Sequence, residues 1–462
     1  MINRASFRSY IPLGHSQRTF ARNIPNFRKY GQVKFDFKKI MDNIGLIEQN
    51  CRNRNAIGAN PRVVSRYYDH YKQRRYEIDQ LRRRRNEHAK AIKNIQSIAD
   101  DDERSEKLRK YKNVGVSFKE DLKRYEDDLK IIEYNLMNET LKLPNKTHPD
   151  SPIGDEDKNE IIFVKGHKPQ FDFEPKSHLE IGMQHDLFDF ENGGKLTGSK
   201  FVFIKNQAAL LEMALVNWAL SKAISRGFNP IITPDVTKVD VLEGCGFQPR
   251  DEAGQTYIIQ DDNTELALIG TSEAPLAGML ANEILFQKDF PLKYAAYSHC
   301  FRKEAGRGAV AKGMYRLHQF SKVELFVYCE PHDSDKIFDE MVNLQCEMLD
   351  ELGLHYRGLN MASYELGASA YKKVDLECWF PSKNDFGEIT STSNCTSYQS
   401  RRFNIQYLKG QNEKVLAHTL NGTAAATPRL IMAIIENFQT ENGGFIIPEA
   451  LKPFYLGPDL KV

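Results

Sequence analysis

The sequence predicts an α+β protein in which an N-terminal antiparallel helical hairpin precedes a domain built on an antiparallel β-sheet flanked by helices. Two heptad segments of similar length, joined by a short acidic break, indicate the hairpin, which would be a coiled coil. Farther along, strand-like runs separated by loops rather than by crossover helices indicate the antiparallel sheet. The 462 residues are enough for two or three domains, each with its own core.

The overall composition excludes several classes of protein. Hydrophobic residues make up 41%, charged residues 27%, and the net charge is +2, which is ordinary for folded domains. No apolar run approaches the length that spans a bilayer, so no membrane partner is expected. The seven cysteines are scattered without a C-x-x-C pair, which argues against a zinc site and suits a reducing compartment.

Residues 1–32 are predicted to be a mitochondrial presequence. No acidic residue precedes Asp36, and serine and aromatic residues alternate with cations, as is typical of transit peptides. The cations are Arg4, Arg8, Arg18, Arg22, Arg28 and Lys29. A basic tail that contacts RNA is the alternative. The prediction places the mature protein in the mitochondrial matrix.

Residues 33–145 are predicted to form a domain that carries a long helical arm. Large residues recur at 3,4 spacing from Val64 to Ile95, and the rhythm returns from Leu108 to Leu136 after the break at 97–105. Roughly 35 residues per helix give an arm on the order of 50 Å long. The proline-containing segment 143–152 ends the arm and leaves residues 146–462 for the second domain.

The first helix of the arm is strongly basic, with eleven Lys or Arg against four acidic residues between positions 62 and 93. Such a stripe attracts a phosphate backbone without regard to sequence, so the arm is predicted to contact RNA. The alternative is a solvated coiled-coil face that pairs with the acidic second helix, and Arg74 and Arg85 also occupy seam positions. The candidate contacts are Arg74, Arg75, Arg82, Arg83, Arg84 and Arg85.

In the second domain, residues 206–227 predict a long amphipathic helix that leads into a strand, "FNPIITPDV". Strand-rich segments then follow with loops between them. No G-x-G-x-x-G follows a strand, and "GRGAVAKGM" lacks the G-K-[ST] of a P-loop, so the two common nucleotide-binding folds are disfavoured.

The segment "CFRKEAGRGAVAKGMYRLHQFSKVEL" (300–325) predicts a nucleotide clamp. We expect a strand with Arg302 and Glu304 on one face, a loop with the cations Arg307 and Lys312, and a returning strand with Phe320 and Glu324. An arginine can meet a phosphate, a carboxylate can accept from an exocyclic amine, and an aromatic ring can stack on a base. Taken singly, each residue could instead be an ordinary surface or edge-strand charge.

This segment resembles motif 2 of the class II aminoacyl-tRNA synthetases. Residues 226–234 resemble motif 1, whose proline lies at a dimer interface, and residues 420–439 resemble motif 3, with Arg429 as its arginine. With the basic hairpin, "GTSEAP" (270–275), "DLECWFPSKNDFGEITSTSNCTSYQSRR" (375–402) and "HTLNGT" are similar to the seryl-tRNA synthetases, and most of all to the animal mitochondrial type. The resemblance spans about residues 60–450.

The resemblance implies a homodimer that activates L-serine with ATP and Mg²⁺ and transfers it to the terminal adenosine of mitochondrial tRNA-Ser. The implied catalytic residues are Arg302, Glu388 and Arg429, and Glu388 would also hold the metal. Serine binding is implied for Thr271, Ser272, Glu273, Glu324 and Thr423. ATP binding is implied for Arg302, Lys303, Glu304, Phe320, Glu388, Ile389, Thr390, Ser391 and Arg429.

The loop at 305–313 has fewer cations than related loops, because it keeps only Arg307 and Lys312. Because of this departure, the alternative remains that the chain is a synthetase-like paralogue, which binds RNA or a partner subunit without catalysing aminoacylation. A bare coiled-coil RNA-binding protein is a third reading, but it accounts for the arm alone.

Overall fold

The computed structural model describes residues 35–95, 100–248, 255–260, 264–304, 313–410 and 413–458. The predicted presequence and the cations Arg307 and Lys312 therefore lie outside the described residues. Residues 36–48 and 57–143 belong to one compact unit, whereas residues 49–56 and those from 144 onward belong to another. The first unit is helical, and the second contains the sheets.

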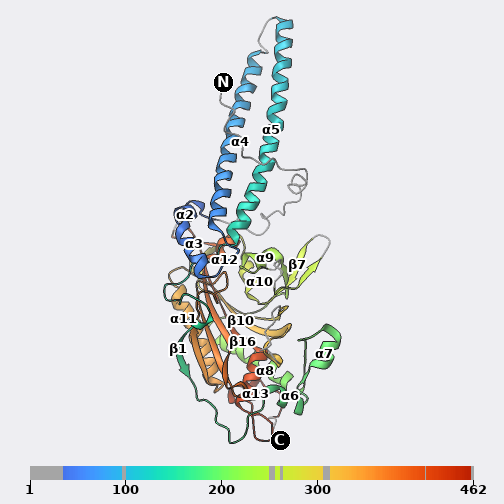
Figure 1. The fold of residues 1–462 in the computed structure, drawn as a ribbon, viewed down its shortest axis with the longest axis vertical. Helices are drawn as coiled ribbons and strands as arrows, with labels where there is room; N and C mark the ends of the chain where they lie inside the picture. The colour runs from blue at the N-terminus through green and yellow to red at the C-terminus, as the bar shows by residue number, and fades with distance from the viewer. Residues whose placement is uncertain are drawn as a thin grey trace. The chain divides into compact units, whose positions relative to one another are not determined.

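Two long helices, α4 (Pro61–Ile95) and α5 (Asp101–Leu141), run side by side in the helical unit and form the predicted hairpin (Figure 1). α4 begins with a proline, which suits a position whose N–H has no partner inside a helix. The acidic break predicted at 97–105 is shorter than expected, because α5 already begins at Asp101. Asp100 caps this helix by accepting from the backbone N–H groups of Asp102 and Glu103, and the acidic first turn suits the helix dipole.

Arg74 lies in the seam of the hairpin, and only 8% of its side chain is exposed. Its guanidinium is 3.2 Å from the carboxylate of Asp128 and 4.4 Å from the ring centroid of Tyr125. His88, another seam residue, stacks on Tyr111 at 4.9 Å. Arg74 therefore binds the two helices together, and its place in the RNA-contacting stripe is corrected on this ground.

The other arginines of the stripe are exposed. Arg82 pairs with Glu126 across the hairpin at 2.9 Å, as the alternative reading of the charges expected. Arg75, Arg83, Arg84 and Arg85 present their side chains to solvent. The basic stripe thus survives on the surface of α4 without Arg74.

An eight-stranded sheet forms the centre of the second unit. Its neighbouring strands are antiparallel except for one parallel pair at an edge, so the predicted α+β class with an antiparallel sheet is confirmed. In spatial order the strands are β1 (Glu160–Lys165), β11 (Tyr356–Asn360), β12 (Lys372–Phe380), β13 (Asp385–Thr396), β16 (His418–Ala426), β10 (Gln319–Cys329), β9 (Leu292–Phe301) and β4 (Asn229–Ile232).

Helices cover both faces of this sheet, as predicted. The larger core lies against α8 (Asn206–Ser225), α11 (Ser334–Glu351) and α13 (Thr427–Asn437). A smaller core on the other face contains residues of α9 (Val239–Gly244), α10 (Glu273–Gly278) and α12 (Tyr398–Phe403).

Strand β10 shows how the two faces are used. Val323, Leu325 and Val327 belong to the larger core, whereas Phe326 and Tyr328 belong to the smaller one, as the alternation of side chains along a strand requires.

The predicted single strand "FNPIITPDV" is two strands, β4 and β5 (Val236–Lys238). Pro234 lies between them and has no N–H for a ladder, so the chain leaves the large sheet there. β5 instead pairs with β7 (Glu265–Leu268) in a small sheet.

The remaining elements are short. The helices are α2 (Phe37–Asp42), α3 (Ile44–Asn53), α6 (His178–Gln184) and α7 (Phe190–Thr197), with 3₁₀ turns η3 (Glu156–Lys158), η4 (Gln287–Asp289), η5 (Gly313–Tyr315), η6 (Pro381–Lys383) and η7 (Glu449–Phe454). The strands are β2 (Phe188–Asp189), β3 (Phe203–Ile204), β6 (Ile258–Gln260), β7 (Glu265–Leu268), β8 (Ile284–Phe286), β14 (Gln406–Lys409) and β15 (Glu413–Leu416). Among the described helices, none combines the length and apolar character needed to cross a membrane.

Candidate active site

A cavity of about 430 Å³ opens on the sheet of the second unit, over strands β10, β13 and β16. It gathers side chains from several separate stretches of the sequence, from residue 245 to residue 429, which the order of the strands brings together. Of the residues implied by the resemblance, those that line it are Thr271, Glu273, Arg302, Glu304, Phe320, Glu324, Glu388, Ile389, Thr390, Ser391, Thr423 and Arg429.

Two implied residues do not line the cavity. Ser272 is fully buried, and its hydroxyl donates to that of Ser298 at 2.6 Å, which holds it in the protein interior. Lys303 is exposed, and its backbone N–H donates to the carbonyl of Gln255 at 2.8 Å. The structure therefore corrects the assignment of the Ser272 side chain to the serine site, whereas the assignment of Lys303 to the ATP site stays a prediction.

Arg302 directly follows Phe301, the last residue of β9. Its guanidinium donates to the carbonyl of Gly270 at 3.3 Å and lies 5.3 Å from the ring centroid of Phe320. A cation and an aromatic face are thus presented together, as a nucleotide site needs.

Glu304 does not share a strand face with Arg302, contrary to the prediction. Its φ of +46° places it in the left-handed region, where the chain turns away from β9. Its carboxylate accepts from Arg316 at 3.1 Å, so the acidic group still faces the cavity, but from a turn rather than from a strand.

Glu273 begins helix α10 at the inner end of the cavity. Its carboxyl accepts from the Gln399 side chain at 2.7 Å, and Gln399 in turn accepts from the hydroxyl of Thr419 at 2.7 Å, which fixes the orientation of the amide. Burial and the neighbouring Glu324 raise the pKa of Glu273 to about 7, although Lys322 opposes the shift. A ligand ammonium placed here would favour the ionised form of Glu273.

Lys322 is a residue of the cavity that the sequence analysis missed. Only 5% of it is exposed, and its ammonium contacts the carboxylate of Glu324 and donates to the hydroxyl of Thr271 at 2.8 Å. Thr423 also donates to Glu324, at 3.4 Å. Its spacing was the available signal, because residue 322 lies two positions from both Phe320 and Glu324 and must share their face.

Asn421, another cavity residue that was missed, lies two positions before Thr423 on β16 and could have been found by the same spacing. At the opposite end of the cavity, Tyr315 and Lys373 were also missed. Neither of these two residues lies at strand spacing from a residue that the sequence analysis assigned, so the spacing gave no signal for them.

The outer end of the cavity is organised around Glu388 and Arg429. The Arg429 guanidinium is 3.2 Å from the Glu388 carboxylate and also donates to the Glu388 backbone carbonyl at 3.0 Å. The hydroxyl of Tyr315 donates to the same carbonyl at 3.3 Å, and its ring centroid is 4.6 Å from the guanidinium. Burial opposes ionisation of Glu388, but Arg429 and then Lys373 outweigh it and lower its pKa to about 2.

This carboxylate fits a divalent cation that arrives with a nucleotide. Glu388 stays ionised, it faces the cavity, and the hydroxyl-bearing Ser391 lies three residues along the same strand. Mg²⁺ commonly takes one or two carboxylates together with substrate phosphates. Within the described ranges, three His, Asp or Glu side chains approach closely enough to share a metal only at Glu330, His332 and Asp333, none of which lines the cavity.

One wall of the cavity is held by a residue far away in the sequence. The Arg54 guanidinium donates to the carbonyls of Ala370 at 2.8 Å, Gly367 at 2.5 Å and Leu366 at 3.2 Å. Gly367 and Ala370 line the cavity. Arg54 is buried, so these carbonyls take the place of its hydration, and the sequence carried no local signal for this contact.

Two family models match the chain. The model described as tRNA synthetase class II core domain (G, H, P, S and T) matches residues 257–438, and the model described as seryl-tRNA synthetase N-terminal domain matches residues 35–147. The first includes most of the cavity residues, and the second includes the whole hairpin.

Curated relatives and solved structures agree with these models. The serine–tRNA ligase of Borrelia recurrentis (strain A1) is 44% identical and aligns over 92% of this chain and 99% of its own, and that of Treponema denticola is 40% identical over 91% and 98%. The crystal structure of the Pyrococcus horikoshii seryl-tRNA synthetase complexed with ATP superimposes with a TM-score of 0.82 at 33% identity, covering 92% of this chain and 99% of that one. The cytoplasmic serine–tRNA ligase from Naegleria fowleri in complex with AMP gives 0.77 at 27% identity, covering 90% and 96%.

Proposed function

The chain belongs to the seryl-tRNA synthetases of class II, and on that premise we propose which of its side chains carry out the reaction. It is an ATP-dependent ligase that joins serine to tRNA-Ser. The observation that carries the assignment of roles is the convergence, in one cavity, of carboxylates at the inner end with arginines and an aromatic ring toward the outer end.

Serine activation needs positioning more than acid–base chemistry. The serine carboxylate is already a nucleophile at neutral pH, and it attacks the α-phosphorus of ATP while the bond to pyrophosphate breaks. Arg302 holds the α-phosphate and the serine carboxylate, Phe320 stacks on adenine, and Glu304 accepts from the adenine amine. A hydroxyl of the terminal adenosine of tRNA then attacks the seryl carbonyl, and AMP leaves.

Arg429 and Glu388 serve the phosphates at the outer end. Arg429 binds the γ-phosphate and stabilises the charge that builds up on the departing pyrophosphate. Glu388, with Ser391 nearby, would hold Mg²⁺, which neutralises phosphate charge when it is bound with the nucleotide. Ile389 and Thr390 follow Glu388 in the sequence and line the same cavity, so they complete the set proposed to bind ATP.

The inner end selects serine. Glu273 and Thr271 receive the ammonium, while Glu324 and Thr423 hydrogen-bond the serine hydroxyl. Alanine lacks the hydroxyl and would leave the buried Glu324 without that partner, which is the kind of discrimination that hydrogen-bonding sites achieve best. Threonine would be rejected sterically, and Thr423, which is larger than serine, helps to close that space.

The division into a presequence at 1–32, an RNA-binding domain at 33–145 and a catalytic domain at 146–462 remains our proposal, as does location in the mitochondrial matrix. The acid-free N-terminus supports both. In the arm, Arg75, Arg82, Arg83, Arg84 and Arg85 are proposed to contact the phosphates of tRNA-Ser, and their exposure supports this role.

A homodimer is proposed through the β4 edge of the large sheet. β4 is an edge strand, and Ile232 at its end leaves 78% of its surface exposed. A large exposed apolar side chain on a free edge is a feature that a second copy would cover.

The function is tested by serine-dependent exchange between ATP and pyrophosphate, using the chain without residues 1–32. We expect exchange with serine but not with alanine or threonine, and its loss in Arg429→Ala. A folded protein that binds ATP but shows no exchange would favour the alternative, a paralogue that binds RNA or a partner subunit without aminoacylation.

A further inference from the structure

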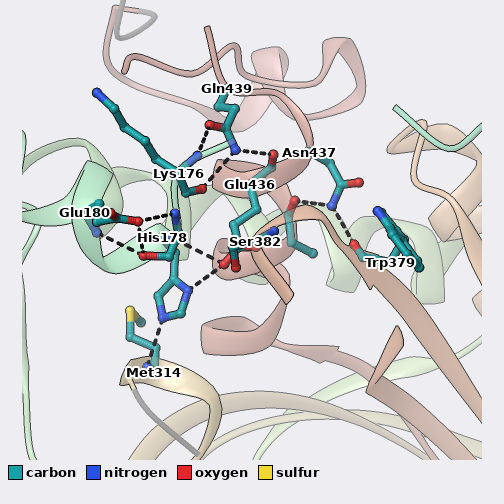
Figure 2. Close-up of polar contacts among 11 residues, drawn as sticks. Lys176, His178, Glu180, Met314, Trp379, Ser382, Glu436, Asn437 and Gln439 are labelled. Carbon is teal, nitrogen blue, oxygen red and sulfur yellow. Dashed lines mark hydrogen bonds and ion pairs between the residues drawn. The ribbon is translucent and has the colours of Figure 1, made fainter. Parts of the chain in front are cut away.

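A buried histidine and a buried glutamate, outside the set of residues assigned above, contact each other close to Met314, which lines the cavity (Figure 2). His178 is the first residue of α6, and Glu436 lies near the end of α13. The Glu436 carboxylate accepts from the His178 ring at 2.8 Å, from the His178 backbone N–H at 3.1 Å and from the Ser382 backbone N–H at 3.2 Å. Burial opposes ionisation of this carboxyl, but the hydrogen bonds from His178 and Ser382 outweigh it and lower its pKa.

These contacts fix the tautomer of the histidine. An ionised carboxylate only accepts hydrogen bonds, so the Nδ1 of His178 that faces Glu436 carries the proton. The other ring nitrogen, Nε2, is left as an acceptor, and the backbone N–H of Met314 points to it at 3.4 Å. Figure 2 shows the ring lying between the carboxylate on one side and Met314 on the other.

The histidine also explains why a glycine precedes Met314. Gly313 has a φ of +73°, and a Cβ at this position would lie 2.3 Å from Nε2 of His178. No side chain fits against the ring there, so the backbone of η5 approaches the imidazole directly. The start of η5 is thus held against His178 by one hydrogen bond and one close packing contact.

Tyr315, the last residue of η5, connects this contact with the cavity. Tyr315 touches Arg429 with its ring and the Glu388 carbonyl with its hydroxyl. Arg429 and Glu436 belong to the same helix, seven residues or about two turns apart. His178 therefore ties η5 to the helix that carries the phosphate-binding arginine.

Two further contacts keep the C-terminal end of α13 in place. The Gln439 side chain forms a paired contact with the backbone of Lys176, donating at 3.0 Å and accepting at 2.8 Å (Figure 2). Asn437 donates to the Trp379 carbonyl at 2.9 Å. Glu436 is thus presented to His178 from a fixed helix end rather than from a flexible one.

We propose that His178 is a positioning residue of the ATP site, which holds Met314 and Tyr315 against α13 so that Tyr315 sets the place of Arg429 and Glu388. This inference rests on the proposed function, in which those two residues bind the phosphates. It assigns no contact between His178 and either substrate. Positioning the ATP site requires that Nε2 of His178 accept from the Met314 N–H. A purely structural role would instead require the hydrogen bond between the His178 ring and Glu436.

Two substitutions separate these requirements. His178→Asn keeps a donor near the position of Nδ1 and loses the acceptor, whereas His178→Gln offers an acceptor near the position of Nε2 and loses the donor to Glu436. We expect ATP binding to weaken about tenfold in His178→Asn and less than threefold in His178→Gln, magnitudes typical of one hydrogen bond. The KM for serine should change less than twofold in both.

The dissociation constant for ATP is measured by titration calorimetry, and both KM values by exchange. Equal ATP affinity in the two variants, or a parallel rise in the KM for serine, would overturn the proposal. Gly313→Ala gives a second route if His178→Asn does not fold, because it displaces the same contact from the other side and should also weaken ATP binding. ATP binding without exchange in the unchanged protein would instead contradict the proposed function, and the calorimetric comparison would still decide the role of His178.

Discussion

Arg429 holds Glu388 twice, once through the carboxylate at 3.2 Å and once through the backbone carbonyl at 3.0 Å. One guanidinium thereby fixes both the charge and the position of the carboxylate proposed to hold Mg²⁺. Because the pKa of Glu388 is lowered to about 2 from 4.5, its contribution to stability is present above pH 4.5 and is lost as the pH falls toward 2.

Replacing Arg429 by alanine should lower the rate of exchange by about 100-fold or more, since a preorganised charge is removed from the phosphates. Steady-state exchange at saturating serine measures this effect. Arg357→Ala is the matched control, because Arg357 pairs with Glu377 on the same sheet but does not line the cavity. Similar losses in both variants would contradict the role of Arg429.

Serine binding should strengthen as the pH rises from 6 to 8. Glu273 has a pKa raised to about 7, and the ammonium of serine prefers the ionised carboxylate. The KM for serine should therefore fall about tenfold across this range. The same shift contributes stability to the substrate-free protein below pH 4.5, which is lost as the pH rises through about 7.

Asp375 is the group that could imitate this profile, because burial also raises its pKa to about 7 beside Lys373. Glu273→Gln separates the two carboxyl groups. It should weaken serine binding and make the KM independent of pH between 6 and 8, and a profile that persists in this variant would assign the titration to Asp375.

Lys322→Met should destabilise the protein by about 3 kcal/mol, because it leaves the buried Glu324 without its cation. Serine affinity should fall as well, since Glu324 and Thr271 lose the group that orients them. Urea unfolding and the KM for serine provide the two measurements. Lys303→Met, at an exposed lysine of the same motif, should change neither, and a loss of ATP binding in that control would confirm Lys303 in the ATP site.

Arg54→Ala should destabilise the protein by about 3 kcal/mol by leaving several buried carbonyls without a donor. The KM for serine should also rise, because the segment 367–370 forms a wall of the cavity. Arg52→Ala is the control, since Arg52 is exposed and its side chain donates to the Gln49 side chain at 2.7 Å, away from the cavity wall. An unchanged KM in Arg54→Ala would limit that residue to a role in stability.

Ile232→Glu should convert a dimer into a monomer with little activity, because a charge on the β4 edge cannot be buried against a second copy. Light scattering gives the mass and exchange gives the activity. Ile162→Glu places the same charge on β1, the opposite edge of the sheet, and should leave the dimer intact. An active monomer in the β4 variant would exclude this edge as the functional interface.

The parts of the site that could be predicted are those in which chemically functional side chains recur at the period of a strand. Phe320 and Glu324 share a strand face by period two, and the structure places both in the cavity. The same logic would have found Lys322, but a lysine between an aromatic ring and a carboxylate was not recognised as part of a serine pocket. The α+β class was predicted for a similar reason, because helical and strand periods differ over long segments.

Other features depend on contacts between distant segments, which no local pattern encodes. Arg54 meets carbonyls more than 300 positions away. Arg74 was placed correctly in the seam of the hairpin and was also assigned to RNA, and only its partners Asp128 and Tyr125 decide between the two. The turn at Glu304 depends on a backbone conformation that its residue type disfavours.

Strand β10 carries Phe320, Lys322 and Glu324 at alternate positions on its cavity face, with the buried Ser321 and the core residue Val323 between them. Losing or gaining one residue between Phe320 and Glu324 would exchange the two faces of the strand on one side of the change, so either the stacking ring or the serine-reading charges would turn toward the hydrophobic core. The nucleotide and amino-acid subsites therefore cannot drift independently through insertions or deletions here. In a lineage of such enzymes, changes of specificity at this strand are confined to substitutions, and the length of the strand is expected to stay constant even where the surrounding loops vary.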